Sequence, residues 1–188
     1  VDVCGIHWGP DSESHIRHPA LIKQHSEAGS WVLIHAFRRE QGLLLAADSA
    51  YRDCSVEEIF SHPLRWSLRQ SGAGAQRFLM EQLSLHRLNA DDLNITTTAL
   101  SDREAAASIA MNSADIAPGV RSAATEYGLD FIPFGWESFD LAIPRSIWFR
   151  RLFQELLQRL KSPAAHKLAD RLTGYDLSRS GELVWGDE

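Results

Sequence analysis

Long apolar runs and positive charge are scarce in this sequence of 188 residues. No run approaches the ~20 apolar residues that a membrane-spanning helix needs. The N-terminus also lacks the charged segment and apolar core of a signal peptide. The net charge of −6 argues against a nucleic-acid surface here, because such surfaces need clustered lysine and arginine. Any contact with DNA is therefore assigned to a separate upstream module, and no membrane contact is expected.

Cysteine and the common catalytic motifs are scarce as well. The two cysteines, Cys4 and Cys54, are far apart without a CxxC spacing, which predicts free thiols in a reducing, cytoplasmic compartment. No G-x-S-x-G or H-E-x-x-H motif occurs, although composition alone leaves a Ser-His-Asp arrangement open. The spacing around His7 and Asp11 fits no strong zinc signature. An enzyme, a metal and a cofactor are therefore not expected.

What is present is an alternation of strand-like and helix-like segments, which predicts an α/β fold with a mostly parallel sheet and helices on its faces. Strands are expected over 1–8, on both sides of a polar connection at 38–41, over 64–70, 92–100 and 114–120, and as two short segments within 129–144. Helices are expected over 19–28, 55–62, 75–85, 103–113, 122–128 and 148–172, with a break at Pro163.

Several helix ends carry local signals. Ser55 and Ser101 are each followed three residues later by glutamate, which is the capping-box spacing. Gly128 is expected to close the helix before it. Pro19 is expected in a first helical turn, where its missing N–H costs nothing.

The Gly-rich stretch "LRQSGAGAQRFLMEQL", Leu68 to Leu83, joins a strand to an amphipathic helix. Backbone N–H groups at a helix start stabilise an anion, and small residues let it approach closely. The stretch is neither a Walker A loop nor a GxGxxG fingerprint, so a tight turn chosen for packing stays an alternative. Its candidate ligand-binding residues are Arg69, Gln70, Ser71, Gly72, Ala73 and Gly74.

Other candidates lie near expected strand ends, where ligands of open α/β sheets bind. The guanidinium groups of arginines in the connection at 38–41 could bind an oxyanion through several hydrogen bonds. A solvated turn or a salt bridge would also explain arginines at these positions. Ser101 is explained by its cap role alone. The candidates are His7, Trp8, Arg38, Arg39, Gln41, Ser101, Gly119 and Val120, with backbone amides of a turn expected at the last two.

The segments "HAFRREQGLLLA", "LRWSLRQSGAGAQRFLMEQL", "SDREAAASIAMNSADIAPGVRSAATEYGLDFIPFGWESFDL" and "LTGYDLSRSGE" occur in this order. They resemble the periplasmic-binding-protein-like domain found behind helix-turn-helix modules in bacterial, molybdate-type transcriptional regulators. The resemblance covers nearly the whole chain. The sequence differs from the family pattern at the Gly-rich turn, where two hydroxyl residues are lost, and at "ADSAYRD". The resemblance therefore predicts the fold better than it predicts the ligand.

This resemblance implies a type II binding-protein fold, with two α/β lobes and a cleft between them. Lobe 1 would hold residues 1–62 and 145–188, and lobe 2 residues 63–144. The implied function is ligand sensing for a transcriptional regulator, with a small anion such as molybdate or tungstate in the cleft. Closure on the ligand would bias an attached DNA-binding module or a homodimer interface.

Two other classes stay open at this point. One is an enzyme or accessory protein of molybdenum-cofactor metabolism on the same lobes, and the other is a structural domain with an empty cleft. The chain opens without methionine, so we expect a domain cut from a longer protein with a DNA-binding segment upstream.

Overall fold

A computed structural model describes residues 2–25 and 30–186. The chain divides into two compact units, the first made of Val1–Arg39 and Trp136–Glu188 and the second of Glu40–Gly135. Strands β2 (Trp31–Leu45) and β6 (Asp130–Pro144) each run from one unit into the other. The resemblance implied boundaries at 62/63 and 144/145, whereas these units divide at 39/40 and 135/136.

The first unit is built on β1 (Cys4–Ile6) and on the adjoining halves of β6 and β2, with β1 antiparallel to β6. Two short strands near the C-terminus pair with β2 in the antiparallel sense. They are β7 (Tyr175–Asp176) and β8 (Leu183–Gly186).

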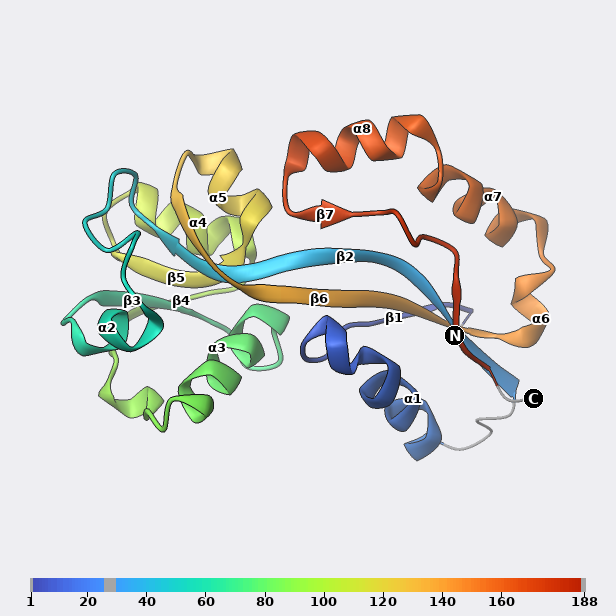
Figure 1. The fold of residues 1–188 in the computed structure, drawn as a ribbon, viewed down its shortest axis with the longest axis horizontal. Helices are drawn as coiled ribbons and strands as arrows, with labels where there is room; N and C mark the ends of the chain where they lie inside the picture. Colours follow the sequence, from blue (N-terminus) through green and yellow to red (C-terminus); the bar gives the residue numbers. More distant parts are fainter. Residues whose placement is uncertain (1, 26–29, 187–188) are drawn as a thin grey trace. The chain divides into compact units, whose positions relative to one another are not determined.

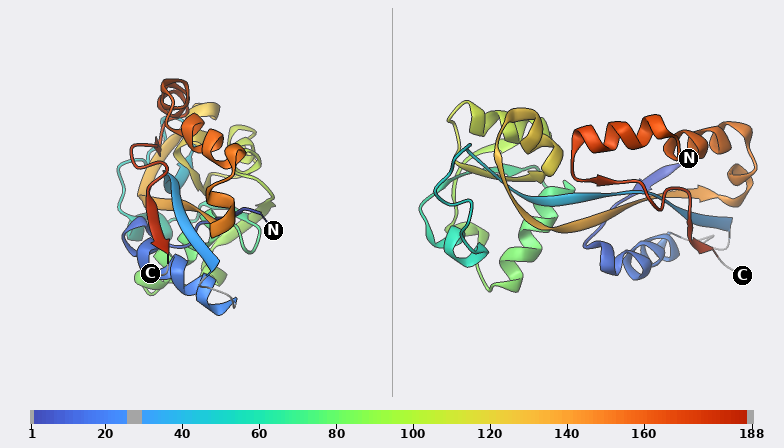
Figure 2. Two further views of the ribbon diagram at one scale, coloured as in Figure 1. Left: turned by 90° about the vertical axis from the view of Figure 1, so that its right-hand side faces the viewer. Right: turned by 45° about the horizontal axis from the view of Figure 1, so that its top comes forward.

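Helices lie on both faces of the first unit's sheet. The 3-10 turn η1 (Asp11–Glu13) leads into α1 (Ser14–Gln24), and Ile22 of α1 packs on Leu33 and Ala142. Val32, Ile34 and Ile143 point to the other face, where they pack with Phe153 and Leu157. The helices of that face are α6 (Arg145–Trp148), α7 (Arg151–Leu160) and α8 (Pro163–Leu172), and Figures 1 and 2 both show α8 running beside β7.

The second unit has the strand order β2-β5-β3-β4. Its strands are β3 (Arg65–Arg69), β4 (Asn94–Ala99) and β5 (Ile116–Val120). Strand β3 is parallel to β4 and β5, whereas β5 is antiparallel to β2. The expected mostly parallel sheet is therefore wrong as a general description, because β2 is antiparallel to β5, β7 and β8, and β1 is antiparallel to β6.

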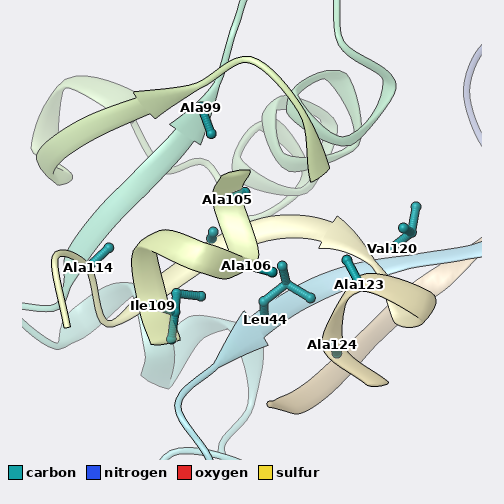
Figure 3. Packing of buried hydrophobic residues seen from close by; sticks show 10 residues of the cluster. Leu44, Ala99, Ala105, Ala106, Ile109, Ala114, Val120, Ala123 and Ala124 are labelled. Atoms are coloured by element: carbon teal, nitrogen blue, oxygen red, sulfur yellow. The ribbon is translucent and has the colours of Figure 1, made fainter. Parts of the chain in front are cut away.

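Side chains of the second unit alternate between two cores, as the period of two in a strand requires. Leu44 and Ala117 pack against α4 (Asp102–Ala110) and α5 (Arg121–Tyr127), in the alanine-rich layer of Figure 3. Leu43, Leu45 and Ile116 pack on the opposite face with α2 (Val56–Ser61) and α3 (Gly74–Leu85). Figure 1 shows these two helix pairs on opposite sides of the strands, and the 3-10 turn η3 (Ala90–Asp92) precedes β4.

Most local signals are confirmed. Ser55 and Glu58 form a full capping box, and Gly128 ends α5 in the left-handed conformation. Pro163 opens α8 behind the cap Ser162, although a second break at 149–150 separates α6 from α7. Phe78, Leu79 and Leu83 form the buried stripe of α3, whereas Leu85 at its end is exposed.

Helix α1 corrects the placement of Pro19. The helix begins at Ser14, so Pro19 lies inside it rather than in its first turn. The helix gives up one backbone hydrogen bond there, because proline has no N–H. The expected end of this helix, at 26–28, and the first residue of the expected first strand lie outside the described residues.

Gly42 is expected to tolerate no side chain. A Cβ at this position would lie 2.1 Å from the Ile132 carbonyl oxygen and 2.7 Å from Cζ of Phe131. Because backbone atoms cannot yield as a flexible side chain can, Gly42→Ala should lower the free energy of unfolding by about 3 kcal/mol. Urea denaturation measures this loss.

Gly72→Ala is the control for Gly42→Ala. Gly72 has φ +87°, but a Cβ at this position would meet no atom within 4 Å, so its replacement should cost only the backbone strain of about 1 kcal/mol. Equal losses in the two variants would contradict the steric explanation.

Candidate functional site

The polar corner of the second unit lies where β3 and β4 end. These strands are parallel, and Arg69 is in register with Ala99, so their carboxyl ends share one edge. Helices α3 and α4 begin directly after them. The backbone N–H of Gln70 donates to the Ala99 carbonyl at 3.2 Å, which ties the two strand ends together. Two helix N-termini, each with a partial positive charge, therefore start at the same edge.

Arg69 brings a guanidinium group to this corner. The residue is 9% exposed, and its backbone N–H donates to Oε1 of Gln76 at 2.9 Å. Its Nε and Nη1 are buried without a hydrogen-bond partner among the described residues. Nη1 forms an ion pair with Asp102, whose Oδ1 lies 3.6 Å away, beyond hydrogen-bonding distance. Buried charged donors without acceptors are costly, so this arrangement calls for an explanation.

The two helix starts differ in how they are capped. Helix α4 has a side-chain cap: Ser101 Oγ accepts from the Glu104 N–H at 3.1 Å, and Glu104 Oε2 accepts from the Leu100 N–H at 2.8 Å. Helix α3 has Ala73 as its N-cap and no side-chain cap. Its first-turn N–H groups have no partner inside a helix, and Ser71 and Gly72 beside them are exposed. The start of α3 is thus the better place for an anion.

The arginines of the first unit are already held by carboxylates. Arg38 donates to Asp11 at 3.2 Å and also to Asp176, and its guanidinium lies 5.4 Å from the centre of the Trp136 ring. Arg39 is paired with Glu137, which is almost fully buried. Burial raises the pKa of Glu137, but hydrogen bonds and charge from His7 and Arg39 outweigh it and lower the pKa. An anion at these arginines would compete with carboxylates of the same unit.

The ion pair between Arg38 and Asp176 makes the free energy of unfolding depend on pH in the acid range. Burial raises the pKa of Asp176, but hydrogen bonds from Arg38 and Ser178 outweigh it and lower the pKa from 3.8 to about 2. A carboxyl group whose pKa is lower in the folded chain than in the unfolded chain stabilises the fold at every pH above its unfolded pKa. This contribution disappears as the pH falls from about 4 to 2. We expect a loss of about 1–2 kcal/mol over this range.

Urea denaturation between pH 5 and 2 checks this dependence. Asp176→Asn should flatten the acid slope, while Asp91→Asn, at an exposed position, should leave it unchanged. An unaltered slope in Asp176→Asn would show that this carboxyl does not carry the effect.

His7 and Trp8 are held by a buried network in the first unit. The Trp8 N–H donates to Nε2 of His18 at 3.1 Å. Asp140 bridges two histidines, at 2.6 Å from Nδ1 of His18 and 2.9 Å from Nδ1 of His35. Because Nε2 of His18 accepts a hydrogen bond, its proton sits on Nδ1 and is donated to Asp140. The His7 ring stacks on Phe139 with centroids 5.3 Å apart.

Five expected site residues lie inside strands instead of loops: Arg38, Arg39 and Gln41 in β2, and Gly119 and Val120 in β5. Gln41 belongs to β2 and is buried, in register with Val120 of β5. Gly119 faces Gly42 in the same ladder, and a Cβ on it would lie 2.8 Å from Cδ1 of Leu44. The turn expected at Gly119 and Val120 is therefore wrong, and close packing explains the glycine.

The structure thus groups the candidates within units. Arg69, Gln70, Ser71, Gly72, Ala73 and Gly74 form one strand-to-helix corner, and Ser101 caps the neighbouring helix. The sequence analysis left Asp102 and Asp140 out of the site. Asp102 directly follows a recognised cap, which was a usable signal, whereas the partners of Asp140 lie more than 100 residues away.

Comparison with known proteins decides the family. The family model described as "PBP superfamily domain" matches residues 1–161. The chain belongs to this family. A PBP superfamily domain accounts for the mixed α/β units described above.

No helix of the described residues has the length and apolarity to cross a membrane. Those residues also contain no cluster of three or more His, Cys, Asp or Glu suited to a metal ion.

One curated relative and two solved structures illustrate the similarity of this PBP superfamily domain. Protein YvgK of Bacillus subtilis (strain 168), described as uncharacterized, is 24% identical over 184 residues, which are 97% of this chain but only 59% of the relative. A Clostridium perfringens protein, described as a phosphate ABC transporter substrate-binding protein with bound phosphate, aligns with a TM-score of 0.65 at 10% identity. That alignment covers 93% of this chain and 78% of the other.

The second structure is the Synechocystis PCC6803 CcmR regulatory domain in complex with 2-PG. Its TM-score is 0.59 at 10% identity, with 84% of this chain and 71% of the other covered. Identities this low show a shared fold and do not transfer a ligand.

Proposed function

We propose that this PBP superfamily domain binds a small oxyanion at the corner formed by Arg69 and the start of α3. One observation carries the proposal: the Arg69 guanidinium is buried while its Nε and Nη1 have no hydrogen-bond partner among the described residues. An oxyanion accepts charge-assisted hydrogen bonds from both the guanidinium and the first amides of the helix. Binding would turn a costly arrangement into a favourable one.

In this proposal the domain senses its ligand by binding it and does not convert it chemically. The fold is shared with a regulatory domain and with a transporter binding protein, and both were solved with small ligands. In this proposal the domain serves a cytoplasmic transcriptional regulator whose DNA-binding module is a separate segment. The sequence resemblance suggests molybdate or tungstate, and the two structural neighbours add phosphate and 2-PG to the candidates.

Isothermal titration calorimetry tests the proposal on the purified chain. Molybdate, tungstate, sulfate, phosphate and a simple carboxylate such as acetate are titrated at pH 7 and at low and moderate salt. We expect saturable 1:1 binding of at least one tetrahedral oxyanion, and none of acetate at the same concentration. Absence of binding for the whole panel would contradict an oxyanion site.

A further inference from the structure

Helices α6 and α7 of the first unit expose a strip of apolar side chains. Phe149, between the two helices, is 83% exposed, and Leu152 in α7 is 79% exposed. Leu156 follows one turn after Leu152 and is also exposed, and side chains four residues apart lie on the same face of a helix. The buried residues of α7 are Phe153 and Leu157, so the strip is not part of the core. Contiguous apolar side chains at a surface are typical of an interaction site.

A hollow of about 300 Å³ opens beside Phe149 on the same side of the sheet. Its lining is mostly apolar and comes from β2, α6 and β8 as well as from Phe149. The lining residues are Val32, Arg145, Trp148, Phe149 and Leu183. A hollow of this size is at the small end of ligand pockets. In complexes between proteins, the side chains that contribute most to affinity fill pockets of this kind.

The helices around the strip are strongly basic, although the net charge of the chain is −6. Residues 145–172 contain seven lysines and arginines but only two carboxylates, Glu155 and Asp170. The seven cations are all exposed: Arg145, Arg150, Arg151, Arg159, Lys161, Lys167 and Arg171. Among the described residues, the pair of Arg151 with Glu155 is the one ion pair recorded for them. Positive charge around apolar side chains favours a partner that is both acidic and apolar.

The combination of strip, hollow and charge distinguishes between possible occupants. A symmetric contact between two copies would bring the same patch of each chain together, and the excess positive charges would repel. A nucleic-acid backbone would pair with the cations but leave the apolar strip in water. An amphipathic helix fits all three features, because its apolar side chains at i, i+4 and i+7 enter a hollow and cover a strip beside it.

We propose that the α6–α7 face, formed by Phe149, Leu152, Leu156 and the hollow, binds an acidic amphipathic helix of a partner protein. One large apolar side chain of the partner would fill the hollow, and its next apolar turn would cover the leucines. Aspartate and glutamate beside these anchors would pair with cations such as Arg145 at the rim of the hollow. The face lies in the first unit and shares no residue with the corner at Arg69, so it goes beyond the proposed function and does not depend on it.

Fluorescence anisotropy with two labelled synthetic peptides tests this proposal on the purified chain. The first peptide has leucine and phenylalanine on one face of a helix and glutamate on the other. The second has the same composition in an order without an apolar face. At pH 7 the unmodified chain should bind the amphipathic peptide at least tenfold more tightly than the scrambled one. Added salt should weaken this binding, because opposite charges contribute to it.

Two variants of the face are compared with matched variants elsewhere. Leu152→Ser and Arg145→Gln should each weaken binding of the amphipathic peptide by at least about fivefold. Leu85→Ser and Arg87→Gln are the controls, because they change exposed residues of the second unit. Both controls should bind as tightly as the unmodified chain. Thermal melts confirm that each variant is folded.

Four outcomes would overturn the proposal. If neither peptide binds, or if both bind equally, the face does not dock an amphipathic helix. Unchanged affinity in both Leu152→Ser and Arg145→Gln would place the peptide elsewhere on the chain. Binding to phosphatidylglycerol vesicles but to neither peptide would assign the face to a lipid surface. Self-association of the unmodified chain that Leu152→Ser abolishes, with neither peptide bound, would assign the face to a second copy.

Discussion

Arg69→Ala should lower the affinity for the bound oxyanion by at least about 100-fold, which removes the ligand-induced rise in melting temperature. The variant deletes charge-assisted hydrogen bonds in a nearly water-free place, and losses of this kind reach several kcal/mol. Titration calorimetry and thermal melts with the tightest ligand of the panel measure the effect. Arg77→Ala removes the same charge from an exposed position of α3, so it should bind almost normally.

The same position distinguishes a binding role from a structural one. Without ligand, Arg69→Met should melt at the same temperature as the unmodified chain or higher, because a buried guanidinium with unpaired donors gives way to an apolar side chain of similar length. Asp102 keeps partial contact with water and stays solvated. A marked loss of stability in Arg69→Met, with ligand affinity retained in Arg69→Ala, would assign Arg69 to the fold rather than to a site.

Asp140→Ala should lower the free energy of unfolding by about 3–5 kcal/mol. The carboxylate is fully buried and accepts from Nδ1 of both His18 and His35. Its removal leaves two buried N–H donors without an acceptor and opens a cavity beneath the Trp8 backbone contact. Burial raises the pKa of Asp140, but the hydrogen bonds from the two histidines outweigh it and lower the pKa, so the group is ionised at pH 7.

Urea denaturation at pH 7 measures this loss. Asp53→Ala is the control, because the Asp53 side chain is 89% exposed and its pair with Arg52 spans 3.4 Å at the surface. Its effect should stay within about 0.5 kcal/mol. A loss below about 1 kcal/mol in Asp140→Ala would show that the two histidines find other acceptors.

Local signals in the sequence predicted local structure well. The caps at Ser55 and Ser101 involve residues three positions apart, so a single sequence contains the signal for each. The strand-to-helix corner at Arg69 is also local and was found in this way. These parts of the fold need no information from distant residues.

Long strands were missed because their evidence is not local. The polar residues Arg38 and Arg39 interrupt the apolar pattern of β2, yet they continue the strand by pairing with β7. Pro118 and Gly119 favour a turn, but their partners Leu43 and Gly42 in β2 hold them in a strand. Such residues take their conformation from partners far along the chain.

The candidate site residues also differ in whether their environment is set by neighbours in the sequence or by residues far along the chain. The corner proposed to bind an anion could be predicted from sequence, because a helix start and its preceding arginine are close along the chain. The sequence analysis kept a salt bridge open for Arg38 and Arg39, but it could not name their partners Asp11, Asp176 and Glu137, which the fold brings to them. A side chain is available to a ligand only if no closer partner takes it, and distant partners are invisible in one sequence.

The central claim is that Arg69 and the first amides of α3 hold an oxyanion. A phosphate titration followed by ¹⁵N NMR, with the arginine Nε–H groups observed together with the backbone amides, tests it most directly. The account predicts saturable shifts of the Arg69 Nε–H and of the Gly74 and Ala75 amides, all with one dissociation constant. Shifts confined to the Arg38 and Arg39 side chains, with Arg69 unchanged at saturation, would contradict it.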